Sequence, residues 1–110
     1  MSVFGGYRTM WVIVMFDLPT MTSEDRKRYR LFHDFLEDDG FDRMQYSIYI
    51  RHCASEENAA VHMARVRATL PQDGEVRIIS ITDKQFGRIQ VYQGRLPRKA
   101  EAAPQQVGLF

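Results

Sequence analysis

The stretch MWVIVMFDLP, Met10–Pro19, limits most strongly what this chain can fold into. Seven apolar residues follow one another before Asp17, and Pro19 ends the run. A strand with one solvated face alternates apolar and polar residues, so an unbroken run predicts a central strand that is covered on both faces. Its β-branched and aromatic residues favour a strand over a buried helix. Asp17 therefore lies where this strand leaves the core.

A carboxylate at the end of a rigid strand can reach solvent, a metal ion or nucleic acid. The alternative interpretation is that Asp17 only terminates the strand. The sequence around it leaves both interpretations open.

The composition indicates a single domain of ordinary globular character. The chain has 110 residues and a net charge of +1, which gives no overall attraction to nucleic acid. A single cysteine, Cys53, excludes an internal disulfide and fits a reducing compartment. The N-terminus lacks the features of a secretory signal, and no apolar run approaches the roughly 20 residues that span a bilayer. We therefore expect a cytoplasmic protein without a membrane partner.

Hydrophobic periodicity and capping residues predict the order of the elements. The expected elements are a strand at 10–17, a helix at 24–39, two short strands within 41–51, a helix at 55–70, a strand at 75–82 and an edge strand at 85–92. Gly40 is expected to end the first helix, and Pro71 the second. Residues 1–9 are expected to form a loose lead-in, 10–93 the folded domain, and 94–110 a flexible tail.

Two apolar stripes are expected to face the core. In the first helix the stripe contains Tyr29, Leu31, Phe32, Phe35 and Leu36. In the second helix it contains Ala59, Met63, Val66 and Leu70.

This order matches the split βαβ, ferredoxin-like α+β fold, in which both helices cover one face of an antiparallel sheet. The other face would then be solvated, yet Met10–Asp17 and Glu75–Thr82 are apolar on both sides. No third helix is predicted to cover it. The pattern therefore predicts a homodimer that packs sheet against sheet, with the strand 85–92 pairing with the partner's sheet edge.

Few residues fit known catalytic chemistry. The three histidines are scattered, and no zinc motif, phosphate loop or serine elbow is present. Cys53 lacks a local base and is expected to be an inert thiol. Asp17 remains, with the basic run Arg26–Arg30, for which a solvated helix surface is the alternative. Hard cations such as Mg²⁺ take one or two carboxylates, which Asp17 and its symmetry mate could supply to activate a water.

Four features together resemble a known family. They are FDLP after the apolar strand, the basic helix that follows, Gly40-Phe41-x-Arg43-x-Gln45-Tyr46-Ser47-Ile48-Tyr49, and Ile81-Thr82-Asp83-x-Gln85. Over about residues 10–93 the chain is similar to CRISPR-associated protein 2, the small subunit of the spacer-acquisition machinery. The resemblance implies a ferredoxin-like homodimer.

The resemblance implies two roles that differ in class. In the first, the homodimer bridges two integrase dimers, and its basic surface supports the double-stranded protospacer DNA. The backbone-contact candidates are Arg26, Lys27, Arg28, Arg30 and Arg43. In the second, the protein is an endonuclease that cleaves RNA or DNA with Mg²⁺ held at Asp17. Many relatives have tyrosine before this aspartate, whereas this chain has Phe16, so a hydroxyl that could orient water is absent.

Two further hypotheses concern the tail and the sheet. The chain ends in Val107, Gly108, Leu109 and Phe110, and a terminal apolar peptide is either a free end or a segment that binds a partner such as the integrase. A ferredoxin-like RNA-binding module unrelated to CRISPR would instead expose strand aromatics for base stacking, and Tyr49 is the candidate for that role.

Overall fold

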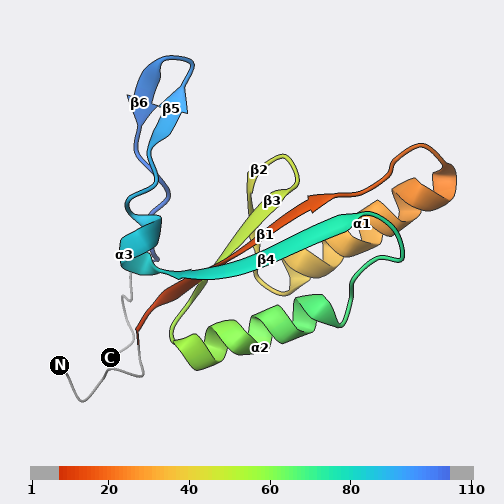
Figure 1. The fold of residues 1–110 in the computed structure, drawn as a ribbon, viewed down its shortest axis with the longest axis horizontal. Coiled ribbons are helices and arrows are strands. Elements are labelled where there is room, and N and C mark those ends of the chain that lie inside the picture. Colours follow the sequence, from red (N-terminus) through yellow and green to blue (C-terminus); the bar gives the residue numbers. More distant parts are fainter. Residues whose placement is uncertain (1–7, 105–110) are drawn as a thin grey trace.

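The computed structural model describes residues 8–104, which form a mixed α+β domain (Figure 1). The strands are β1 (Met10–Asp17), β2 (Asp42–Gln45), β3 (Ile48–Cys53), β4 (Glu75–Thr82), β5 (Val91–Gln93) and β6 (Leu96–Arg98). The helices are α1 (Ser23–Asp38), α2 (Glu56–Arg67) and α3 (Asp83–Phe86). None of these helices is long and apolar enough to cross a membrane.

The first six elements form the predicted ferredoxin-like fold. The main sheet has the strand order β2-β3-β1-β4, and all neighbouring strands are antiparallel. The apolar run places β1 in the interior of the sheet, since it pairs on one side with β3 and on the other with β4. The prediction of a central strand is therefore confirmed.

Helices α1 and α2 cover one face of the sheet. Their core residues Phe32, Leu36 and Val66 form one buried cluster with alternate residues of β1. The Thr22 side chain caps α1 as part of a capping box with Asp25, and Ser55 caps α2. Both helices thus begin where the capping residues predicted.

The predicted stripes contain two errors. Leu31 is 57% exposed and Leu70 is 46% exposed. Helix α2 ends at Arg67, so Leu70 lies beyond the helix and its four-residue spacing from Val66 no longer places it on the buried face. Leu31 lies beside the boundary of the stripe, where one step along a helix turns a side chain by about 100°.

The opposite face of the sheet carries a second, smaller apolar cluster. Trp11, Ile13 and Ile50 are buried in it together with Phe86 of α3. The rings of Phe86 and Trp11 stack with centroids 4.0 Å apart, and Trp11 Nε1 donates a hydrogen bond to Asp83 at 2.6 Å. The expectation that no helix covers this face is therefore wrong at one end, where α3 does so.

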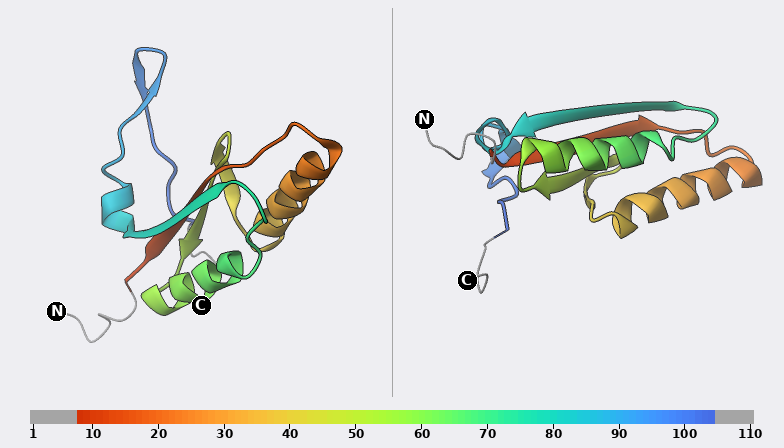
Figure 2. Two further views of the ribbon diagram at one scale, coloured as in Figure 1. Left: turned by 45° about the vertical axis from the view of Figure 1, so that its right-hand side comes forward. Right: turned by 90° about the horizontal axis from the view of Figure 1, so that it is seen from below.

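The C-terminal part differs from its prediction. Residues 85–92 do not form an edge strand, because a capping box between Thr82 and Gln85 begins α3 at this point. Strand β5 instead pairs with β6, which falls within the predicted tail 94–110, in a separate two-stranded sheet. This hairpin stands away from the main sheet in Figure 1 and again in the turned view of Figure 2.

The two ends of the chain are described only in part. Within the predicted lead-in, the Thr9 carbonyl accepts a hydrogen bond from the Asp83 N–H at 3.1 Å. The predicted partner-binding residues Val107, Leu109 and Phe110 lie outside the described residues.

Candidate functional site

Asp17 is the last residue of β1 and is exposed to solvent. It pairs in register with Glu75, the first residue of β4. Side chains directly opposite each other on antiparallel strands share a face, with Cβ atoms about 4.5–5.5 Å apart. Asp17 and Glu75, from different strands of one chain, therefore lie opposite each other at this end of the sheet face that the large helices leave uncovered.

A positively charged side chain, that of Arg77, lies next to these two acidic residues. Arg77 Nη2 donates to Glu75 Oε1 at 3.0 Å, and both side chains are about 70% exposed. An exposed pair of this kind contributes little to stability, typically about 0–1 kcal/mol. Arg77 can therefore exchange its contact with Glu75 for a contact with another anion at small energetic cost.

These side chains border a cavity of about 300 Å³. The cavity is lined by Met15, Phe16, Asp17, Tyr46, Ser47, Ile48, Glu75 and Arg77. The sequence predicts Asp17, but neither Glu75 nor Arg77, as a site residue. Only the register of β1 with β4 reveals that these two residues belong to the site, since it places Glu75 opposite Asp17 and Arg77 opposite Met15. The sequence alone does not specify this register.

Gly74 fixes the entry of β4 against the end of β1. Its φ is +96°, and a Cβ placed there would lie 2.7 Å from both the Asp17 carbonyl oxygen and Leu18 Cδ2. Only glycine adopts this conformation readily and tolerates such a close approach. The turn before Glu75 therefore packs directly on the backbone of Asp17.

The β2–β3 turn closes the other side of the cavity. Ser47 has a φ of 64°, a left-handed conformation that is uncommon for a residue other than glycine. Its carbonyl accepts a hydrogen bond from the Phe16 N–H at 3.0 Å, which attaches the turn to β1 one residue before Asp17. Its hydroxyl lies 3.4 Å from the Tyr29 hydroxyl on α1. The turn is therefore held in place from two directions.

The predicted nucleic-acid contacts on α1 lie apart from this cavity, since none of them lines it. Arg26 donates to the carbonyls of Thr20 and Met21 at 3.2 Å each, in the loop that follows β1. Arg28 lies 3.6 Å from Asp25 in an ion pair within α1. The other α1 candidates, Lys27 and Arg30, are exposed. The remaining candidate, Arg43 on β2, places its guanidinium 5.1 Å from the centroid of the Tyr46 ring.

The phenylalanine that replaces tyrosine before the aspartate is part of the helix-side core. Phe16 is 7% exposed, and its ring packs against Tyr29, Phe32 and Tyr49. Tyr49 is itself only 1% exposed, so it has no surface to offer a base. The prediction that Tyr49 is exposed for base stacking in an RNA-binding module is therefore wrong.

Other titratable groups serve the fold. His62 Nδ1 lies 2.7 Å from Asp39 Oδ2, and Arg65 donates to Asp39 Oδ1 at 2.9 Å. Burial would raise the pKa of Asp39, but these two hydrogen bonds outweigh it and hold the pKa below its usual value. Cys53 is buried, and burial raises the pKa of its thiol, as expected for an unreactive cysteine.

The donor set for a metal is small. Within residues 8–104 no group of three or more His, Cys, Asp or Glu side chains is placed to hold a metal ion. Asp17 and Glu75 supply carboxylate oxygens, the ligands that a hard cation prefers. Mg²⁺ usually keeps several waters and takes one or two protein carboxylates, so this pair fits a largely hydrated ion.

Comparison with known proteins identifies the family. A family model described as CRISPR associated protein Cas2 matches residues 10–89. The chain is 55% identical over 101 residues to the CRISPR-associated endoribonuclease Cas2 of Parvibaculum lavamentivorans, a match that covers 92% of this chain and 100% of the relative. It is 48% identical to the protein of the same name from Flavobacterium psychrophilum, with 94% of this chain and 90% of the relative covered.

A solved structure gives the same result for the fold. The chain described as "Crystal structure of cas2" superposes with a TM-score of 0.54 at 20% identity, over 88% of this chain and 97% of the other. The molecule is thus a ferredoxin-like protein with an exposed acid at the end of its central strand. This chain belongs to the CRISPR-associated Cas2 family.

Proposed function

We propose that the protein acts in CRISPR spacer acquisition as a homodimer that bridges two integrase dimers and supports the protospacer duplex. The observation that carries this proposal is the incompletely covered second face of the sheet. On this face Ile79 of β4 is 45% exposed, and Ile81 of the same strand is only partly buried. Burial of such a face against a second copy removes apolar area from water at about 25 cal/mol per Å².

The basic residues of α1 suit the duplex-binding part of this role. Lys27 and Arg30 are exposed on a helix that packs on the opposite face of the sheet, so a sheet-to-sheet dimer leaves them accessible. Lysine and arginine bind phosphates through charge without reading sequence. This chemistry fits a protein that holds protospacers of any sequence.

A second function, metal-dependent cleavage of phosphodiester bonds, is favoured by the cavity at Asp17. Both cited relatives carry the name endoribonuclease. In this proposal Asp17 and Glu75 hold a hydrated Mg²⁺ ion, which when bound activates water and polarises the phosphate. Arg77, which lines the same cavity, binds a non-bridging phosphate oxygen and orients the strand.

One variant separates the two functions. Asp17→Asn keeps the size of the side chain but removes its charge, and Asp17 is exposed, so the fold should persist. We expect Mg²⁺-dependent cleavage of RNA or DNA to fall by at least about 100-fold, because metal activation supplies several kcal/mol. We expect spacer integration with the integrase to continue, measured as new repeat–spacer junctions.

The matched control is Asp42→Asn, which changes another exposed acid, on β2, that does not line the cavity. It should leave both activities unchanged. Loss of integration by Asp17→Asn, with the integrase complex still assembled, would contradict the bridging role as the main function. Cleavage that persists in this variant would remove the proposed nuclease site.

A further inference from the structure

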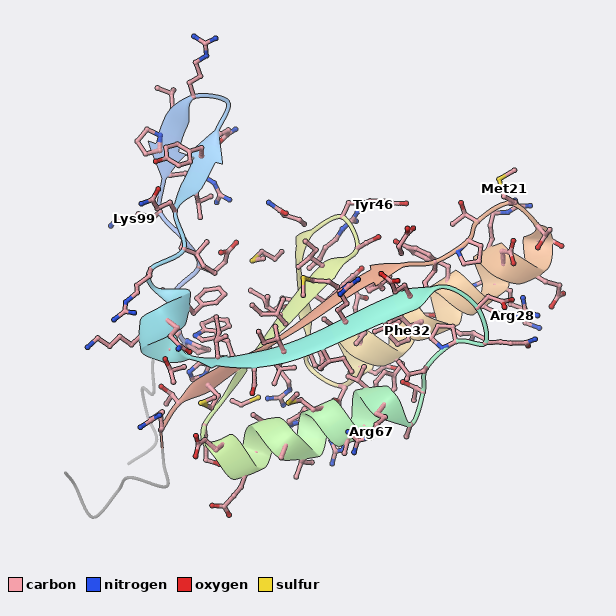
Figure 3. All side chains as sticks on the ribbon, in the orientation of Figure 1. Met21, Arg28, Phe32, Tyr46, Arg67 and Lys99 are labelled. Carbon is pink, nitrogen blue, oxygen red and sulfur yellow. The ribbon has the colours of Figure 1, made fainter. Side chains whose placement is uncertain are left out.

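Tyr46 is a large aromatic side chain without a role in the core. It lies at the tip of the β2–β3 hairpin, as Figure 3 shows, and is 71% exposed. The next aromatic residue along the chain, Tyr49, is buried. Burial therefore does not account for the position of this ring, which lies beside the candidate site.

The turn holds Tyr46 in a fixed place. Gln45 and Ile48 pair across the turn, so Tyr46 and Ser47 alone connect β2 to β3. The left-handed conformation of Ser47 costs about 1–3 kcal/mol at a residue other than glycine. The hydrogen bond from the Phe16 N–H to the Ser47 carbonyl attaches the turn to β1. Tyr46 is therefore presented by a rigid support next to Asp17.

The surroundings of the ring suit a nucleotide. Tyr46 lines the same cavity as Asp17 and Arg77, and the Arg43 guanidinium lies 5.1 Å from its ring centroid. An ordinary tyrosine phenol is uncharged at neutral pH, and the neighbouring Tyr29 raises the pKa of Tyr46 further, so the ring does not repel phosphate. An aromatic ring with a guanidinium group over it and a second arginine in the same cavity is a combination that suits unpaired bases and their phosphates in single-stranded nucleic acid.

We propose that Tyr46 stacks on one unpaired base of a nucleic-acid strand whose adjacent phosphate lies in the Asp17 cavity, with Arg43 and Arg77 contacting the backbone. A base inside a duplex is already stacked on both sides, so Tyr46 makes this site selective for an unpaired nucleotide. The inference rests on the proposed binding of nucleic acid at Asp17. It adds a base-binding residue and the state of the strand that the site accepts.

The test measures binding of a single-stranded oligonucleotide, as RNA and as DNA, and of the matching duplex to the full chain by fluorescence anisotropy. Tyr46→Leu should weaken single-strand binding by about 5- to 100-fold, the usual effect of losing one base–aromatic stack. Tyr46→Trp should restore it, and duplex binding should change little in either variant. A series of oligonucleotides, each lacking the base at a different position, locates the stacked base. Removal of that base should weaken binding to the wild type but not to Tyr46→Leu.

Tyr92→Leu is the matched control, because Tyr92 is also exposed, at 55%, but lies on β5 in the projecting hairpin. Comparable losses in Tyr46→Leu and Tyr92→Leu, or equal losses for single strand and duplex, would overturn the inference. If wild-type protein binds oligonucleotides but no abasic position matters, the stacking role is wrong and the proposed function stands. Absence of any binding by the wild type would instead overturn both.

Discussion

At the scale of single residues, the two carboxylates of the candidate site differ in their partners. Glu75 is bound by Arg77, whereas Asp17 makes no ion pair with any residue in the described range 8–104. Asp17 is therefore the carboxylate that is free to bind a cation. Under the proposed nuclease role, movement of Arg77 from Glu75 Oε1 to a phosphate would release that oxygen and so couple substrate binding to completion of the metal site.

The buried Asp39 gives a prediction about stability. Its side chain is 7% exposed and bonds to both His62 and Arg65, so it joins the end of α1 to α2. Asp39→Asn should lower the free energy of unfolding at pH 7 by about 1–3 kcal/mol, the usual cost of weakening hydrogen bonds to a buried charged group. Urea denaturation followed by circular dichroism measures this change.

The contribution of Asp39 to the free energy of unfolding should change with pH in a definite direction. Because the folded state holds the pKa of Asp39 below its usual value, its stabilising contribution is complete above the unfolded pKa of about 3.9. It is lost as the pH falls through the lower folded value. The difference between wild type and Asp39→Asn should therefore shrink below about pH 4. The neighbouring Asp38→Asn changes an exposed acid and serves as the control, and a difference that stays constant down to pH 2 would refute the assignment.

At the scale of elements, most of the fold could be predicted because local signals and packing agree. The unbroken apolar run predicted β1, and Thr22 and Gly40 marked the limits of α1. The predicted edge strand at 85–92 is wrong because its alternation of apolar and polar residues is weak, whereas the capping box at Thr82 and Gln85 is the stronger local signal. Such competition between signals is decided by tertiary contacts, here the packing of Phe86 on Trp11.

The turn at Gly74, which leads into β4, gives a prediction about both stability and cleavage. Gly74→Ala would place a Cβ at 2.7 Å from the Asp17 carbonyl and force an unfavourable positive φ. We expect a loss of about 1–3 kcal/mol in unfolding free energy, and reduced cleavage because the pairing of Asp17 with Glu75 shifts. Urea denaturation and a cleavage assay on the same preparation measure both effects.

Gly87→Ala is the control for this substitution. Gly87 has a φ of −65°, and a Cβ there would meet its nearest atoms at an ordinary 3.5 Å. The free energy of unfolding of Gly87→Ala should stay within about 0.5 kcal/mol of the wild-type value. Equal effects of the two substitutions would show that the approach of Gly74 to Asp17 does not position the site.

At the scale of the whole molecule, the sequence supplied the centre of the candidate site but not its surroundings. Asp17 could be identified because it interrupts an apolar run. Glu75 and Arg77 could not, because they join Asp17 only through the register of strands that are far apart in the chain. Tyr46 belongs to the motif shared with the family, yet its exposure depends on the conformation of Ser47, which the sequence does not specify.

In the proposed homodimer, two copies bury the remaining apolar face of the sheet against each other. Sedimentation velocity at micromolar concentration tests this packing directly, on wild type, Ile79→Glu and Leu70→Glu. Ile79 and Leu70 are almost equally exposed, at 45% and 46%, but only Ile79 lies on the sheet. We predict a mass of twice 12.9 kDa for wild type and Leu70→Glu, and a monomer for Ile79→Glu. A monomeric wild type, or a dimer that Ile79→Glu leaves intact, would contradict the account.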